Sequence, residues 1–258
     1  MAPMVQLVPE YVGASPSVNP LIVSQGRGSI LFDLVVACAI FFATLIALEI
    51  VGAFVFAGGL DDPVPNAWVL VGQRGFLSVV MGLVLWGLLR KNAQMPASLG
   101  VRNDGVVRSV FWGLVAYVSV FGYVMGLGIL VSLVWPDAVR LMEEAQRENV
   151  ERLPTMGFGV ALAFSLVVSV SEELLFRGLI VTRLRSLTGS WMLAVAISSI
   201  FFAVLHIPQG GMPVAVIFGL SVILGFWMVW QGNLIVPIIA HMLFDLTSLT
   251  WLNRLAGS

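Results

Sequence analysis

Four side chains in the C-terminal half carry the groups that activate water and stabilise an oxyanion. Glu172 is a carboxylate that can act as a general base, and His206 and His241 are imidazoles that can accept or donate a proton. Asp245 follows His241 by four residues, so both side chains lie on one face if the segment is helical. The chain has no histidine besides these two. Together the four groups could activate a water for hydrolysis.

Glu172 stands beside a second carboxylate in the segment 171–177, which reads SEELLFR. Glu173 precedes Arg177 by four residues, the favourable orientation for a salt bridge along one helix, so we expect these two charges to neutralise each other. Glu172 points about 100° away around the same helix and is left without a local partner. A carboxylate without a partner in an apolar helix is costly, which favours a functional role for Glu172.

The composition predicts the environment of these groups. Of the 258 residues, 59% are hydrophobic and 10% are charged, and the mean hydropathy is +1.00. A soluble domain carries about a quarter charged residues. The net charge of −1 and the lack of a Lys/Arg run exclude a nucleic-acid partner, and the single Cys38 excludes an intramolecular disulfide. The chain is therefore expected to be an integral membrane protein that contacts the lipid bilayer.

Seven apolar stretches alternate with short segments rich in Gly, Pro, Asp or Arg, and a bilayer-crossing helix needs about 20 such residues. They cover approximately residues 30–56, 68–89, 107–135, 156–184, 191–206, 214–230 and 234–255. We expect an all-α, polytopic bundle of about seven transmembrane helices with a core of the last four. The chain then divides into a tail (1–28), accessory helices with a polar connection (29–154) and a catalytic core (155–258).

The segments between the helices suggest an orientation. The tail is expected to be mobile or interfacial, and the polar segment 136–154 to form an extramembrane or interfacial helix. Short-loop Arg and Lys residues, such as Arg90 and Lys91, favour an N-terminus on the inner side. This orientation fits a multi-pass protein of a bacterial plasma membrane.

Three charges in the first two helices need separate explanations. Asp33 lies close enough to a helix end to reach the interface, and we assign it no role. Glu49 and Arg74 lie thirteen residues before and twelve after Asp62 in the first hairpin loop, so they share a depth and are expected to form a structural ion pair.

The candidate side chains can meet only if the last helix is placed suitably. Glu172 precedes Thr188 by sixteen residues and His206 follows it by eighteen, so both lie roughly 25 Å along their helices from that loop. His241 and Asp245 lie roughly 12 and 18 Å from the loop before their own helix. Tilt or a buried helix start must close this difference.

At these residues the sequence is similar to the CPBP family, the intramembrane proteases related to the CAAX prenyl endopeptidase and to bacteriocin-immunity proteins. The family pattern is E-E-x-x-x-R, then F-x-x-x-H, then H-x-x-x-N or H-x-x-x-D. This chain matches it with Glu172, Glu173 and Arg177, with Phe202 and His206, and with His241 and Asp245. The resemblance covers about residues 156–255, and the first three helices contribute little to it.

The resemblance implies an endopeptidase that acts on a membrane-associated or lipidated peptide or protein, with a CAAX-type prenylated C-terminus as the reference substrate. Its catalytic residues would be Glu172, His206, His241 and Asp245, while Glu173, Arg177 and Phe202 would be structural or substrate-positioning. The prenyl endopeptidases have Asn at the position of Asp245. An ionised Asp only accepts hydrogen bonds, so Asp245 could instead orient His241 or ligate a metal.

Two mechanisms are open. In the first, Glu172 and His206 hold and deprotonate a water, and His241, with Asp245 behind it, stabilises the oxyanion. In the second, Glu172, His206, His241 and Asp245 supply ligands to a divalent metal such as zinc, as the family's metalloprotease label suggests. The chain lacks H-E-x-x-H, and the ligands would come from three helices. We favour direct activation by Glu172 and His206.

Two functions without proteolysis compete with this interpretation. A small transporter predicts broken helices in matched halves, and the one Pro/Gly-rich break, IPQGGMP at 207–213, has no counterpart. A non-catalytic membrane immunity or binding protein would keep the same residues, so the sequence does not separate it from the enzyme.

Overall fold

The computed structural model describes residues 25–52, 66–102, 105–140 and 154–256, together with Leu21, Phe54 and Glu144. All regular elements in this part of the chain are helical. They are α1 (Arg27–Val51), α2 (Ala67–Lys91), η2 (Pro96–Leu99), α3 (Val106–Val134), α5 (Phe158–Glu173), η3 (Leu174–Val181), α6 (Thr182–Thr188), α7 (Trp191–Val204), η4 (Ile207–Gln209), α8 (Gly211–Gln231) and α9 (Ile235–Ala256).

The predicted all-α polytopic bundle is confirmed, and the chain is an integral, multi-pass membrane protein. Each of the seven apolar stretches forms a helix, and α5, η3 and α6 join into one helix from Phe158 to Thr188. Five helices in the described ranges are long and apolar enough to cross a membrane. The two shorter apolar helices are α7 and residues Ile235–Thr250 of α9.

Most of two predicted segments lies outside the described residues. These are the N-terminal tail, of which 1–20 and 22–24 are not described, and the polar segment 136–154, of which 136–140 are helical.

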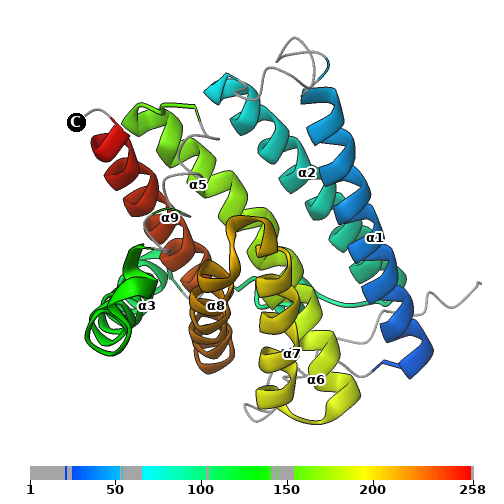
Figure 1. The fold of residues 1–258 in the computed structure, drawn as a ribbon. Helices are drawn as coiled ribbons and strands as arrows, with labels where there is room; N and C mark the ends of the chain where they lie inside the picture. The colour runs from blue at the N-terminus through cyan, green and yellow to red at the C-terminus, as the bar shows by residue number, and fades with distance from the viewer. Residues whose placement is uncertain are drawn as a thin grey trace, which may run out of the picture.

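The helices pack as neighbours in an order that differs from their order in the chain. From one side of the molecule to the other, α1 contacts α2, α2 contacts α5, α5 contacts α9 and α9 contacts α3 (Figure 1). The α7–α8 pair closes the bundle, because α7 contacts η3 and α8 contacts both α3 and α9. The helix formed by α5, η3 and α6 therefore lies between the α1–α2 hairpin and α9, and the third accessory helix, α3, packs on the far side of α9.

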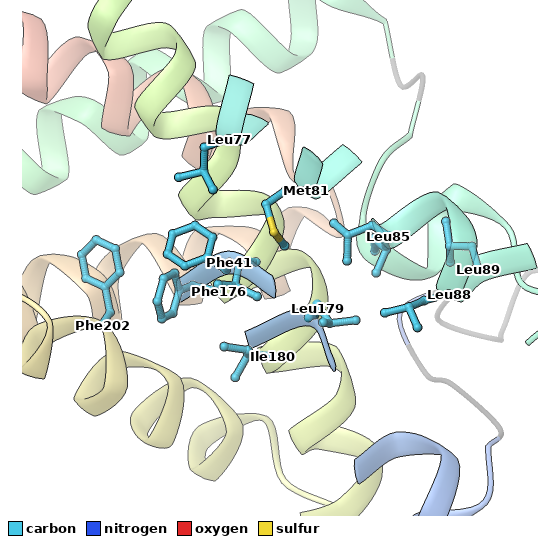
Figure 2. Close-up of a cluster of buried hydrophobic side chains, with 13 residues drawn as sticks. Phe41, Leu77, Met81, Leu85, Leu88, Leu89, Phe176, Leu179, Ile180 and Phe202 are labelled. Atoms are coloured by element: carbon cyan, nitrogen blue, oxygen red, sulfur yellow. The ribbon is translucent and has the colours of Figure 1, made fainter. Parts of the chain in front are cut away.

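A cluster of buried apolar side chains surrounds η3 (Figure 2). Phe176 and Leu179 of η3 pack with Phe41 of α1 and Met81 of α2, and Phe202 of α7 joins the same cluster. The Phe176 ring meets those of Phe41 and Phe202 edge to face, with ring centroids 6.4 and 4.9 Å apart. All residues from 175 to 181 are buried, so η3 depends on contacts from both halves of the chain.

The start of α9 lies inside the bundle. Asn233 and Leu234 are only 2% and 1% exposed, and the backbone N–H of Leu234 donates to the carbonyl of Gly100 at 2.8 Å. A Cβ atom at Gly178 in η3 would lie 3.3 Å from Leu234 Cδ2 and 3.4 Å from the carbonyl oxygen of Leu99. Leu234 is therefore level with the middle of η3.

This buried start brings His241 to Glu173. The contact between Leu234 and Gly178 serves as a common level for the two helices. His241 follows Leu234 by seven residues, and Glu173 precedes Gly178 by five. At the rise of a helix these separations correspond to about 10 and 8 Å, so both side chains reach nearly the same level. Of the two ways expected to close the depth difference, a buried helix start is the one present.

The expectation that Asp33 reaches the interface is wrong. Its side chain is fully buried, because the end of α2 and the joined η3–α6 helix cover the start of α1. Gln25 and Asn92 each donate to Asp33 Oδ2 at 2.9 Å, and Arg183 Nε lies 3.5 Å from the same oxygen. Arg183 is also fully buried, and its Nη2 donates to Gln94 at 2.7 Å. This polar network joins the accessory hairpin to α6.

The predicted ion pair of the first hairpin is confirmed. Arg74 Nη2 donates to Glu49 Oε1, and the Glu49 side chain is 56% exposed, two residues from the end of α1. This pair is peripheral, whereas the Asp33–Arg183 pair lies in the interior.

Replacing Asp33 with Asn should destabilise the fold strongly. Asn keeps the size of the side chain but leaves the buried Arg183 charge without a carboxylate, and breaking a buried pair costs about 3–5 kcal/mol. Glu49→Gln is the matched control, since removing an exposed pair costs less than about 1 kcal/mol. Thermal unfolding in detergent measures both variants. Equal losses of Tm would contradict the structural importance of the Asp33 network.

Gly100→Ala should destabilise the fold more than Gly189→Ala at the end of α6. Both glycines have the left-handed αL conformation, with φ of +81° and +74°, so both substitutions cost about 1 kcal/mol of backbone strain. A Cβ at Gly100 would also lie 3.2 Å from the Leu234 nitrogen, whereas one at Gly189 would meet only the Arg185 side chain, at 4.0 Å. We therefore expect a larger loss of Tm for Gly100→Ala. Similar losses would show that the contact with Leu234 tolerates displacement.

Candidate active site

Three carboxylates surround the His241 imidazole, which is 5% exposed. Glu173 Oε1 lies 2.8 Å from Nδ1, on one side of the ring. On the other side, Nε2 lies 3.5 Å from Asp245 Oδ2 and 3.9 Å from Glu172 Oε2. The predicted meeting of Glu172, His241 and Asp245 is therefore present, and Glu173 joins it.

The donors around Glu173 orient His241. Arg177 Nη1 donates to Glu173 Oε1 at 2.8 Å, as the four-residue spacing predicted. Because a guanidinium only donates, this oxygen is an acceptor, and His241 Nδ1 donates its proton to the same atom. Glu173 is therefore more than the partner of Arg177, since it also fixes the ring of His241.

The opposite side of the His241 ring can hold a second proton. Ionised carboxylates only accept hydrogen bonds, and Nε2 without a proton also only accepts. Glu172 and Asp245 lie 3.9 and 3.5 Å from Nε2, so a proton on this nitrogen would be attracted to both carboxylates. The cluster can therefore share a proton between His241 and its most accessible side chains.

Arg177 lies deeper and is fixed by two further elements. The guanidinium is 1% exposed, and its Nη2 donates to the hydroxyl of Ser221 on α8 at 3.0 Å and to the Ser221 carbonyl at 3.3 Å. Its Cζ lies 4.7 Å from the centroid of the Phe202 ring of α7. Sequence reasoning missed Ser221, because a serine in an apolar helix carries no local signal of its partner.

His206 lies just beyond the end of α7 and packs near the Phe202 ring. Its Nδ1 is 2.8 Å from the Phe202 carbonyl, which only accepts, so Nδ1 carries the proton and Nε2 is free to accept. The Phe202 ring centroid lies 4.8 Å from that of His206 and 6.1 Å from that of His241. Within the described ranges, His206 forms no ion pair with Glu172 or Asp245. The structure places it near the cluster without direct contact.

Exposure separates the carboxylates into two groups. The Glu172 and Asp245 side chains are 23% and 25% exposed, whereas Glu173 is fully buried. Glu172 and Asp245 are therefore the carboxylates that a substrate can contact, whereas Glu173 acts only through His241 and Arg177. The expectation that Asp245 lies behind His241 does not match this geometry, because Glu173 occupies that side of the ring.

A divalent metal finds no ready-made site here. Across the described ranges, no group of three or more His, Cys, Asp or Glu side chains is arranged so that it could hold a metal ion. In the cluster, Glu172 and Asp245 approach the single nitrogen Nε2 of His241, whereas the Nδ1 of His206 bonds to the Phe202 carbonyl. The proposed ligands therefore do not fit a zinc site as they stand.

The helix changes its geometry immediately after the two glutamates. Residues Leu174–Val181 form a π-helix, a rare widening that is frequent at functional sites. Ser198 of α7 donates to the Phe176 carbonyl at 3.0 Å, and Thr182 donates to the Gly178 carbonyl at 2.6 Å. These hydroxyl groups satisfy carbonyls of the widened segment, and Arg177 itself meets α8 through Ser221.

Comparisons with known proteins point to the same part of the chain. Residues 154–247 match the family described as Type II CAAX prenyl endopeptidase Rce1-like. The uncharacterized protein YpbD of Bacillus subtilis (strain 168) is 32% identical over 83 residues, which are 31% of this chain and 39% of that protein. This chain thus covers less than half of that relative's length. No solved structure matches.

The segment that matches the family contains the whole cluster around His241, including Glu172, His206 and Asp245. The three motifs occur in it in the expected order, on α5, at the end of α7 and on α9. Residues 154–247 are therefore similar to the Rce1-like type II CAAX prenyl endopeptidases, which confirms the resemblance drawn from the sequence.

Proposed function

We propose that this chain is an intramembrane endopeptidase of the CAAX type that hydrolyses a peptide bond in a membrane-associated or lipidated substrate. One observation carries the proposal: Glu172, a partly exposed carboxylate, faces an imidazole nitrogen of His241 that Glu173 orients from behind. A general base and a hydrogen-bond donor thus lie side by side where water can reach them, as amide hydrolysis requires.

The reaction begins with a water near Glu172. Glu172 takes one proton of the water, and the acceptor Nε2 of His206 holds the other hydrogen. The water oxygen bonds to the carbonyl carbon of the substrate, and the electron pair of the C=O double bond moves to the carbonyl oxygen. We place the shared proton of the cluster on His241 Nε2, where it donates to this developing oxyanion.

The second half of the reaction breaks the C–N bond. The oxyanion collapses to a carboxyl group, and the nitrogen of the leaving amine receives the proton that Glu172 had taken. Asp245 lies on the same side of His241 and accepts from the imidazole between turnovers. Glu173 and Arg177 touch no substrate in this scheme and hold His241 in place.

The helix lengths support a supply of water to this region. With 14 residues, α7 is about 21 Å long, and the hydrocarbon core of a bilayer is about 30 Å thick. The backbone that follows, η4 and Gly210, is irregular. Irregular backbone within a membrane is tolerated where it lies against protein or lines a water-filled cavity, and His206 is partly exposed at this point.

A divalent metal remains the other way to activate water, and our scheme assigns it no step because its ligands are not gathered. If zinc were bound after a rearrangement, Glu172, His206, His241 and Asp245 would be its ligands, and the metal would lower the pKa of its water.

Glu172→Gln and His206→Ala should each lower cleavage of a fluorogenic membrane peptide by the purified protein at least about 100-fold, since both groups act on the attacking water. Glu49→Gln, which alters a membrane carboxylate outside the cluster, is the control and should cleave like the parent. Circular dichroism and Tm in detergent verify that all variants are folded.

Parent-like cleavage by folded Glu172→Gln and His206→Ala would end the protease proposal. A parent protein that binds the peptide without cleaving it would favour the non-catalytic binding protein. Preincubation with a chelator should leave the activity unchanged, and a loss restored by added zinc would favour the metal mechanism instead.

A further inference from the structure

One hydroxyl group of α8 reaches into the buried side of the cluster. Ser221 is the only Ser, Thr or Tyr in α8, and it is 2% exposed. Its hydroxyl and its carbonyl both accept hydrogen bonds from Arg177 Nη2, at 3.0 and 3.3 Å. No family motif of the sequence includes this residue.

Ser221 is the first member of a chain of buried hydrogen bonds that ends at His241. Arg177 donates to Ser221 with one terminal nitrogen and to Glu173 with the other, and His241 donates to the same Glu173 oxygen. All four side chains are at most 6% exposed. Hydrogen bonds to charged groups are strong when buried, so these contacts position one another.

The orientation of the Glu173 carboxylate depends on the far end of this series of hydrogen bonds, at Ser221. Among the described residues its buried Oε2 has no hydrogen-bond partner, so the two donors at Oε1 orient the carboxylate. A guanidinium that shifts therefore turns the carboxylate, and a carboxylate that turns releases His241 Nδ1. The Phe202 ring, 4.7 Å from Arg177 Cζ, packs against the guanidinium without supplying a directional acceptor.

We propose that Ser221 is a positioning residue that holds His241 through Arg177 and Glu173, an inference that rests on the proposed protease function. Without the hydroxyl, Arg177 Nη2 keeps only its longer bond to the Ser221 carbonyl. Ser221 thus lets α8, which supplies no catalytic residue, contribute to the stabilisation of the oxyanion by His241.

Ser198 of α7 provides the matched control. It is also 2% exposed, and its hydroxyl donates to the Phe176 carbonyl of η3 at 3.0 Å. Ser221→Ala and Ser198→Ala therefore each remove one buried hydroxyl that bonds to η3. Only the first removes an acceptor of Arg177.

The test compares kcat, KM and Tm of the two variants with those of the parent. Ser221→Ala should lower kcat about tenfold, equivalent to ~1.4 kcal/mol, with KM within twofold. Ser198→Ala should keep kcat within twofold of the parent. Its loss of Tm should be similar to that of Ser221→Ala. If Ser221→Ala does not fold, Ser221→Cys keeps the volume with a weak acceptor and should also lower kcat. A folded Ser221 variant with the kcat of the parent would overturn the proposal.

A spectroscopic measurement separates this proposal from the protease function. The chain has two histidines, so ¹⁵N-histidine labelling gives two sets of ring signals, and a His206→Gln sample identifies those of His241. Ser221→Ala should shift the His241 nitrogen signals, and Ser198→Ala should leave them unchanged. Unshifted His241 signals in Ser221→Ala would overturn the link even if the parent cleaves peptides. Shifted signals with an inactive parent would contradict only the protease proposal.

Discussion

The hydrogen bond between His241 and Glu173 is the interaction on which the rest of the structure depends. A fully buried carboxylate is tolerated only with donors around it, and Glu173 finds them in Arg177 of its own helix and in His241 of α9. This bond joins the glutamate-bearing helix to the last helix at one level. It requires the buried start of α9 at Leu234, and the Arg177 that shares the Glu173 oxygen is itself held by Ser221 of α8.

The first two helices contribute to the same arrangement from the opposite side. They carry none of the family motifs, yet Phe41 of α1 and Met81 of α2 pack with η3, and Asp33 approaches the buried Arg183 of α6. Apolar packing alone gives membrane helices little orientation, because lipid tails are as apolar as the side chains. The Asp33 network supplies polar contacts that fix how the accessory hairpin meets the helix that bears Glu172.

The two histidines differ in what each can offer to a reaction. The Nδ1 of His206 donates to the Phe202 carbonyl, which leaves Nε2 of that ring as an acceptor. The Nδ1 of His241 donates to Glu173, and Nε2 of His241 faces the carboxylates of Glu172 and Asp245. One ring is thus suited to hold a water and the other to donate to an oxyanion. Both imidazoles lie near the Phe202 ring, whose centroid is 4.8 Å from that of His206 and 6.1 Å from that of His241.

Hydropathy and short spacings determined the class of protein, the helices and the Glu173–Arg177 pair, because a run of apolar residues and a four-residue separation have the same meaning in any helix. Only the tertiary structure decided that Asp33 is buried, that α9 begins level with η3 at Leu234, and that Ser221 meets Arg177. These features depend on the axial position and the rotation of each helix relative to its neighbours. Side-chain packing between distant segments sets both, and no local pattern of residues encodes them.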